Sequence, residues 1–140
     1  LRENILFLDP KLDEAVLNNI LRDADLKDFL DLTPNGLDTI ITENGKNLPL
    51  GIRRRLSLAR CLVTNGQLVI LDEPTDALDE KGIRAVYKIM NSLMKANKTI
   101  IVFSNDPKIL KGASLMLNLN IKPKPELTSQ AAPELKGDRS

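Results

Sequence analysis

The apolar positions of this chain follow a helical period in three segments. Residues 13–32 carry apolar side chains at every third or fourth position, in two pieces, which predicts two short helices with Asp13 as the first N-cap. The same spacing over residues 52–63 predicts a further helix, which Asn65 and Gly66 end. Residues 80–97 have the clearest apolar stripe and predict the longest helix.

Three other segments are apolar without a helical period. Residues 67–71, 99–104 and 114–119 are short and bounded by polar residues, so we predict that they are buried strands. A strand, a helix and a second strand with short connections indicate a parallel sheet covered by helices, and therefore an α/β fold. Residues 121–140 are rich in proline and polar residues and are predicted to be a flexible tail.

Composition narrows the classes of partner. The chain has 140 residues, the length of one ordinary domain or of a piece of a larger protein. It contains no Trp, one Tyr and three Phe, and its formal net charge is +1. Few aromatic side chains are available to stack on bases, and little net positive charge is available to neutralise phosphates. We therefore expect no nucleic-acid partner.

The charge is distributed unevenly although its sum is close to zero. Residues 1–50 contain 5 Lys/Arg and 10 Asp/Glu, a net charge of −5, whereas residues 51–111 contain 11 and 6, a net charge of +5. Either the two segments form faces with different partners, or these charges are ordinary solvated surface.

The cysteine and histidine content limits the catalytic and metal-binding groups that the chain can offer. The absence of histidine removes the commonest general base and metal ligand. The single cysteine, Cys61, lies among apolar residues, and we expect a small buried side chain rather than a reactive thiol. No apolar run approaches the roughly 20 residues that cross a bilayer, and the first residues do not form a signal-peptide pattern.

The segment LVILDEPTDALD, residues 68–79, places two carboxylates directly after the first predicted strand. Ligands of open parallel sheets bind beyond the carboxyl ends of the strands. At that edge Asp72 can hold magnesium, usually through water, and Glu73 can polarise a water that attacks a terminal phosphate. An acidic helix cap is the alternative, but four apolar residues followed by Asp-Glu-Pro-Thr favour the nucleotide site.

Four segments in register resemble the ATP-binding domain of ABC transporters. LVILDEPTDALD resembles the Walker B motif and D-loop, and LPLGIRRRLSLARCL at 48–62 stands where the family has its signature motif. TIIVFSNDPKIL at 99–110 resembles the switch segment, and residues 1–47 resemble the helical subdomain of ABC exporters, entered just after the Q-loop.

This resemblance implies the C-terminal part of a P-loop NTPase domain of the RecA-like, ABC type. Residues 1–50 correspond to the helical subdomain, and residues 51–120 to the signature helix and the C-terminal part of the α/β core. ATP and Mg²⁺ are the implied cofactors. A P-loop requires G-x-x-x-x-G-K-[ST], and the only Gly-Lys pair, Gly45 and Lys46, lacks the rest of that pattern. We therefore expect an ATPase in a larger protein and inactivity of these residues alone.

The signature segment departs from the family pattern. Pro49, Leu50 and Ile52 stand in place of its serine, first glycine and glutamine, and only Gly51 is retained. In the family, this segment donates hydrogen bonds to the γ-phosphate of ATP held by a partner domain, so the resemblance assigns all four positions to cofactor binding. The signature segment of this chain therefore has fewer hydrogen-bond donors than the family pattern.

The other positions that match the family differ in whether they keep the family's residue. Asp79 matches the D-loop aspartate that bridges the two nucleotide sites, and Asn105 replaces the switch histidine, so the resemblance assigns Asn105 a catalytic role without its charge. Arg53 and Arg55 match basic positions of the family or are plain solvated charges. Glu43 lies in the loop that touches the membrane domain in exporters, or is simply exposed.

The resemblance implies a domain that couples nucleotide-driven dimerisation to transport across a membrane. Its partners would be a second ABC ATPase domain, identical or different, and a transmembrane domain encoded upstream, which would hold it at the cytoplasmic face of the cell membrane. The alternative is a degenerate, weakly hydrolysing regulatory ABC subunit, favoured by Pro49 and Asn105 and opposed by Glu73. A chromosome- or repair-type ABC ATPase does not fit, because residues 13–32 are too short for its coiled-coil insertion.

Overall fold

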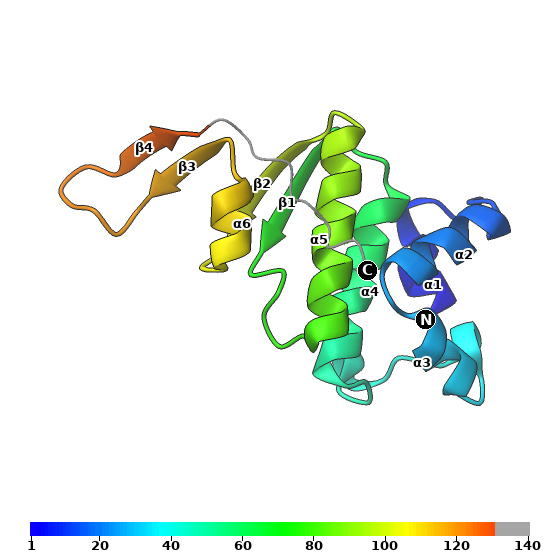
Figure 1. Ribbon diagram of the computed structural model, residues 1–140. Helices are drawn as coiled ribbons and strands as arrows, with labels where there is room; N and C mark the ends of the chain where they lie inside the picture. The colour runs from blue at the N-terminus through cyan, green and yellow to red at the C-terminus, as the bar shows by residue number, and fades with distance from the viewer. Residues whose placement is uncertain (131–140) are drawn as a thin grey trace. The chain divides into compact units, whose positions relative to one another are not determined.

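The computed structural model describes residues 1–130, whose helices and strands are labelled in Figure 1. They fall into two compact units, with the boundary in the sequence between Val102 and Phe103. The first unit consists of α1 (Arg2–Ile5), η1 (Leu6–Leu8), α2 (Glu14–Asp23), α3 (Lys27–Leu32), η2 (Gly36–Asp38), η3 (Glu43–Gly45), α4 (Leu50–Val63), β1 (Leu68–Asp72), α5 (Glu80–Lys95) and nearly all of β2 (Thr99–Phe103). The second contains α6 (Pro107–Gly112), β3 (Leu115–Asn118) and β4 (Glu126–Ser129).

The helices predicted from apolar spacing are present. The segment 13–32 forms α2 and α3 as two pieces, and Asp13 caps α2 by accepting hydrogen bonds from the backbone N–H groups of Ala15 (2.8 Å) and Val16 (3.2 Å). The 52–63 pattern is α4, and the 80–97 pattern is α5, which Asp79 caps.

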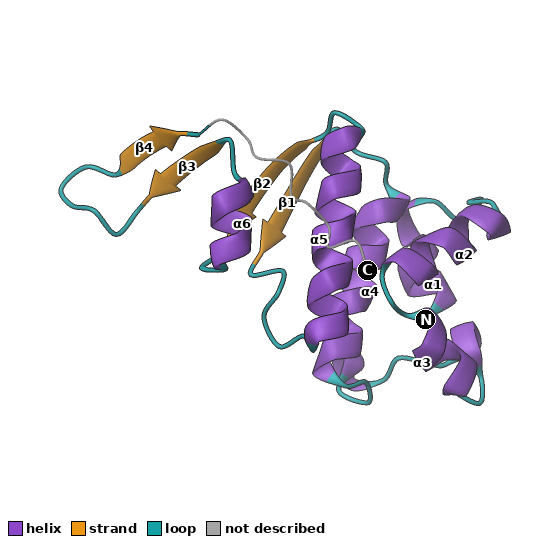
Figure 2. Cartoon of the chain, in the orientation of Figure 1, coloured by secondary structure: helices purple, strands orange, loops and turns teal. Residues whose placement is uncertain are grey.

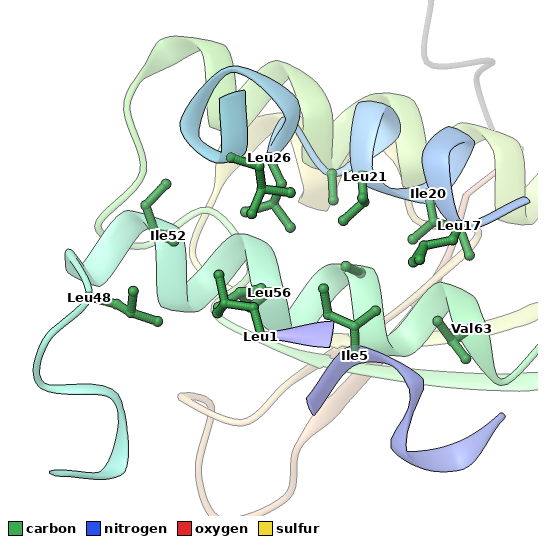
Figure 3. Packing of buried hydrophobic residues seen from close by; sticks show 13 residues of the cluster. Leu1, Ile5, Leu17, Ile20, Leu21, Leu26, Leu48, Ile52, Leu56 and Val63 are labelled. Atoms are coloured by element: carbon green, nitrogen blue, oxygen red, sulfur yellow. The ribbon is translucent and has the colours of Figure 1, made fainter. Parts of the chain in front are cut away.

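One apolar core holds the first helices on α4. Side chains from α1, α2 and the α2–α3 turn meet one face of α4 (Figure 3). Ile5, Leu17, Leu21 and Leu26 are each at most 1% exposed. Burying one such side chain stabilises a fold by about 1.5–3 kcal/mol, so this cluster fixes the helices against the helix that carries the signature segment.

The predicted parallel pair of strands is confirmed. β1 and β2 are hydrogen-bonded neighbours that run in the same direction (Figure 2). α5 connects them in sequence and packs against α2 and α4. The arrangement is the α/β architecture that the strand–helix–strand order predicts.

The prediction that 67–71 is buried on both faces is wrong. Val69 and Leu71 are buried, but Leu68 is 53% and Ile70 is 60% exposed, and Ile101 of β2 is 44% exposed. Successive strand side chains point to opposite faces, so one face packs on the helices while the other is uncovered within residues 1–130. Apolar sheet surface is thus exposed within the described residues.

The third predicted strand exists but is neither buried nor part of the β1–β2 sheet. β3 pairs with β4 in an antiparallel hairpin, with Leu117 opposite Leu127, and both side chains are more than half exposed. β4 lies within residues 121–140, where the sequence predicts a flexible tail, so part of that segment is ordered as a strand. Residues 131–140 lie outside the described part of the chain.

Candidate functional site

Asp72 and Glu73 occupy the carboxyl end of β1. Asp72 is the last residue of the strand and is exposed, whereas Glu73 is half-buried and has a left-handed backbone conformation with φ of 42°. The N–H of Asp76 donates to the carbonyl of Glu73 at 3.1 Å, and Ala77 is also left-handed, with φ of 55°. Two non-glycine residues in this conformation within one short loop indicate strain, which persists only where surrounding contacts fix the backbone.

Contacts from α4 fix this loop. Arg54 Nη2 lies 3.3 Å from Asp76 Oδ2, and Arg55 Nη2 donates to Asp79 Oδ1 at 2.6 Å. The first turn of α4 also approaches the loop closely, since a Cβ on Gly51 would lie 3.7 Å from the carbonyl oxygen of Ala77. The helix that carries the signature segment therefore positions the loop that follows Asp72 and Glu73.

Asp79 serves as the N-cap of α5 in addition to binding Arg55. Its Oδ1 accepts the N–H of Gly82 at 2.8 Å. That backbone hydrogen bond, with the pairing to Arg55, lowers the pKa of the Asp79 carboxyl. The aspartate that the family resemblance assigns to bridging two domains is thus bound within its own chain in this structure.

Arg55 also reaches Asp25 in the turn between α2 and α3. Its Nη1 donates to the Asp25 carbonyl at 3.3 Å, and its Nη2 lies 3.1 Å from Asp25 Oδ2. The side chains of Arg55 and Asp25 are 12% and 15% exposed, so Arg55 is not the solvated charge that sequence allowed. Lys81 binds the other oxygen of Asp25 at 3.1 Å and pairs with Asp28. Sequence reasoning missed Asp25 and Lys81, since no periodicity marks ion pairs between residues so far apart.

The signature positions have different surroundings. Pro49 is the N-cap of α4 and supplies no side-chain cap hydrogen bond, and Leu50 in the first turn is 47% exposed. Gly51 is half-buried. The side chain of Ile52 is 8% exposed and points into the apolar core (Figure 3), so only its backbone remains for the cofactor-binding role that the sequence assigned to it.

The two remaining predicted residues are Asn105 and Glu43. Asn105 is exposed and belongs to the second unit, between β2 and Asp106, the N-cap of α6. Glu43 is exposed at the start of η3. Beside η3, a pocket of about 450 Å³ is lined by residues that include Asn44, Arg53 and Arg60, and its lining contains no carboxylate.

The donor set at the end of β1 suits a hard cation that brings further ligands with it. Among residues 1–130, no group of three or more His, Cys, Asp or Glu could hold a metal ion. Mg²⁺ is commonly held by one or two carboxylates together with waters and substrate phosphates, a requirement that the exposed carboxylate of Asp72 meets. In the same described part, no helix is both long and apolar enough to cross a membrane.

Parallel strands, a carboxylate pair beyond the carboxyl end of β1 and an attached helical layer define part of a nucleotide-binding α/β domain of the P-loop NTPase class. Residues 2–76 match the family model described as ABC transporter. The chain belongs to the ABC transporter family, and its relatives are of the exporter type.

Two relatives carry the name ATP-dependent lipid A-core flippase. That of Desulfotalea psychrophila is 35% identical over 114 residues, covering 81% of this chain and 20% of the relative. That of Chromobacterium violaceum is 44% identical over 81 residues, covering 58% of this chain and 14% of the relative. A solved structure of a bacterial Atm1-family ABC exporter with ATP bound matches with a TM-score of 0.74 and 26% identity, covering 83% of this chain and 20% of that one. The chain therefore spans a fifth or less of the length of these proteins.

Proposed function

We propose that this chain is part of the ATP-hydrolysing domain of an ABC exporter, in which ATP-driven association of two such domains powers transport. The observation that carries the proposal is the placement of Asp72 and Glu73 at the carboxyl end of β1, in a loop held by α4. The exporter relatives favour this function over a weakly hydrolysing regulatory subunit.

The residues divide the chemistry between them. Asp72 would hold Mg²⁺, which when bound neutralises charge on the phosphates. Glu73 would orient the attacking water and accept its proton, and Asn105 would donate a hydrogen bond to the γ-phosphate. The half-buried position of Glu73 restricts its motion, which suits a group that must be aligned with one water.

Asp72 and Glu73 supply only part of a nucleotide site. The 140-residue sequence contains no G-x-x-x-x-G-K-[ST] motif, whose backbone N–H groups cradle phosphates. We propose that the full-length protein has a P-loop upstream and that residues 1–140 alone neither hydrolyse ATP nor bind it tightly. Turnover by the purified 140-residue chain that Glu73→Gln abolishes would contradict this part of the proposal.

The proposed partners are a second ATPase domain and a transmembrane domain at the cytoplasmic face of the membrane. The pocket beside η3 supports docking of the transmembrane domain, because Arg53 and Arg60 on its rim have no ion-pair partner in residues 1–130. An intracellular loop with an acidic residue would complement this rim. Glu43, exposed next to the pocket, is a second candidate contact.

The test uses the full-length protein. Glu73→Gln should lower ATP hydrolysis by about 10²-fold or more while ATP binding is retained, because the amide cannot accept the proton but keeps the shape of the side chain. Glu80→Gln, at an exposed carboxylate in the first turn of α5, is the matched control and should hydrolyse ATP normally. Normal hydrolysis by Glu73→Gln would exclude Glu73 as the base.

A further inference from the structure

Arg55 faces two carboxylates and forms a well-aligned hydrogen bond with only one of them. Its Nη2 donates to Asp79 Oδ1 at 2.6 Å and lies 3.1 Å from Asp25 Oδ2. That oxygen of Asp25 is buried and has no hydrogen-bond donor among residues 1–130, and Arg55 Nε is buried without an acceptor. The contact between Arg55 and Asp25 thus includes a carboxylate oxygen without a hydrogen-bond donor and a guanidinium nitrogen without an acceptor.

The two carboxylates differ in their access to water. The Asp79 side chain is 67% exposed, so water can hydrate it whenever it leaves Arg55. Asp25 is 15% exposed, and Arg55 is 12% exposed. A poorly exposed guanidinium without a carboxylate is costly, and Asp25, already 3.1 Å from Arg55 Nη2, is the carboxylate that remains when Asp79 leaves.

Close packing limits where the guanidinium can go. A Cβ on Gly82 would lie 3.2 Å from Arg55 Nε and Nη2 and 3.1 Å from Asp79 Oδ1. The absence of a side chain at this position leaves the guanidinium room against the first turn of α5. Arg55 Nη2 already lies 3.1 Å from Asp25 Oδ2, so a small rotation of the guanidinium is enough to align that hydrogen bond.

We propose that Arg55 is a positioning residue that exchanges its hydrogen-bond partner between Asp79 and Asp25. In the state described here it holds Asp79 against α5. In the other state it donates that hydrogen bond to Asp25 Oδ2, which it already contacts, and Asp79 becomes free to contact a second molecule. The exchange links the loop after Glu73 to the turn between α2 and α3, because the same guanidinium contacts both and shifts its well-aligned hydrogen bond from one to the other.

The consequence for activity rests on the proposed function. If two ATPase domains associate around ATP, release of Asp79 makes its carboxylate available to the facing domain. Asp25 then acts before hydrolysis and after nucleotide binding. It would affect the rate of turnover and leave the apparent affinity for ATP unchanged.

A double-mutant cycle on unfolding of the 140-residue chain tests the exchange without ATP. Asn is used at both positions because it keeps the side-chain shape, and at position 79 it keeps a capping oxygen. Asp25→Asn and Asp79→Asn should each be tolerated, because the remaining carboxylate takes Arg55. The double variant should raise the unfolding equilibrium constant at least about tenfold beyond the product of the single effects. A combined effect equal to or below that product would overturn the proposal.

Two controls separate exchange from other coupling. In an Arg55→Met background the excess should disappear, whereas simple repulsion between the two carboxylates would survive there and would overturn the proposal. Asp28→Asn combined with Asp79→Asn should give the plain product of the single effects, because Asp28 pairs with Lys81 and not with Arg55. A double variant that is unfolded while both single variants are folded also shows the predicted excess.

Kinetics of the full-length protein provide a second readout that a merely structural role would not produce. Asp25→Asn should lower kcat for ATP at least about fivefold with KM within about twofold, and Asp28→Asn should leave both within about twofold. An Asp25→Asn protein with wild-type kcat would overturn the proposal. Failure of the wild-type protein to hydrolyse ATP would refute the proposed function, while the unfolding cycle would still decide the exchange.

Discussion

Arg54 and Asp76 connect the signature helix to the loop after β1 by an ion pair of 3.3 Å that remains accessible to water. The two side chains are 39% and 64% exposed. The adjacent arginine, Arg55, also binds this loop, at Asp79, and in addition contacts Asp25, whose side chain is 15% exposed. Both of these arginines of α4 therefore hold the loop, and Arg55 also holds the turn between α2 and α3 through a less exposed pair.

This difference predicts unequal costs for the same substitution. Arg54→Gln should lower the free energy of unfolding by no more than about 1 kcal/mol, because exposed pairs contribute little. Arg55→Gln should lower it by about 2 kcal/mol, because it removes charged hydrogen bonds from a poorly exposed site and leaves Lys81 as the one cation on Asp25. Urea unfolding of both variants measures the costs. Similar costs would show that the burial of Asp25 and Arg55 has no energetic consequence.

The uncovered face of the β1–β2 sheet predicts self-association of the 140-residue chain. Leu68, Ile70 and Ile101 are 53%, 60% and 44% exposed, and contiguous apolar surface of this kind favours association or poor solubility. Ile70→Lys should shift the chain toward monomer in sedimentation experiments. Leu32→Lys, at an apolar residue of α3 that is 87% exposed, is the control and should change association less. A wild-type chain that is strictly monomeric contradicts the prediction.

Local patterns predicted α2, α3, α4 and α5 and the Asp13 cap because each depends on neighbours within a few residues, and the short strand–helix–strand order predicted the parallel strands. Asp13 precedes a regular apolar stripe and caps it as expected. The burial of β1 was predicted wrongly because it depends on which faces other segments cover, and Leu68 shows that one face is open. The stripe that begins at Ile52 already implied a core position, yet the motif comparison treated Ile52 as part of a ligand site.

The uneven charge of the sequence also has a physical explanation that neither sequence-based alternative contained. Acidic residues of the first segment pair with basic residues of the second, as Asp23 does with Lys88 at 2.8 Å and Asp25 with Arg55 at 3.1 Å. Such pairs join residues far apart in sequence and have no period. Only the fold brings them together.

Cys61 should react slowly with alkylating reagents. Burial raises the pKa of its thiol, so the nucleophilic thiolate is depleted at pH 8. Because the folded pKa exceeds the unfolded one, the associated stability is complete below the unfolded value, near 9.0, and is lost as pH rises through the folded value. Iodoacetamide at pH 8 should modify folded protein at least about tenfold more slowly than urea-unfolded protein. Cys61→Ser with Ser57→Cys, at an exposed position of the same helix, should react at nearly the same rate in both states.

If two copies of the full-length protein associate, the signature segment should limit their ATP hydrolysis. Pro49 supplies neither a hydroxyl nor an N–H, and Leu50 places an exposed side chain where a phosphate would approach α4. Loss of one charge-stabilising donor costs about 10²–10³ in rate. Pro49→Ser with Leu50→Gly should therefore raise the ATPase rate at least about tenfold, equivalent to about 1.4 kcal/mol.

A matched variant separates helix capping from catalysis in that experiment. Pro49→Asp with Leu50→Gly also supplies an N-cap oxygen to α4 and should stabilise the helix. Its negative charge would oppose a phosphate, so its ATPase rate should stay below that of the serine variant. Equal rates for the two variants would mean that capping alone explains the gain, and no gain in either would mean that the signature does not limit turnover.

Asn105→His, added to the restored signature, should raise the full-length protein's ATPase rate further. Asn105 can donate a hydrogen bond to a γ-phosphate but cannot carry positive charge, whereas histidine is partly charged near its unperturbed pKa of about 6.5. The gain over Asn105 should therefore be larger at pH 6 than at pH 8, by at least about twofold, because the imidazolium is populated below its pKa. Asn105→Leu, which removes the donor altogether, should lower the rate at both pH values. A histidine gain that is equal at pH 6 and pH 8 would show that hydrogen bonding, not charge, limits this position.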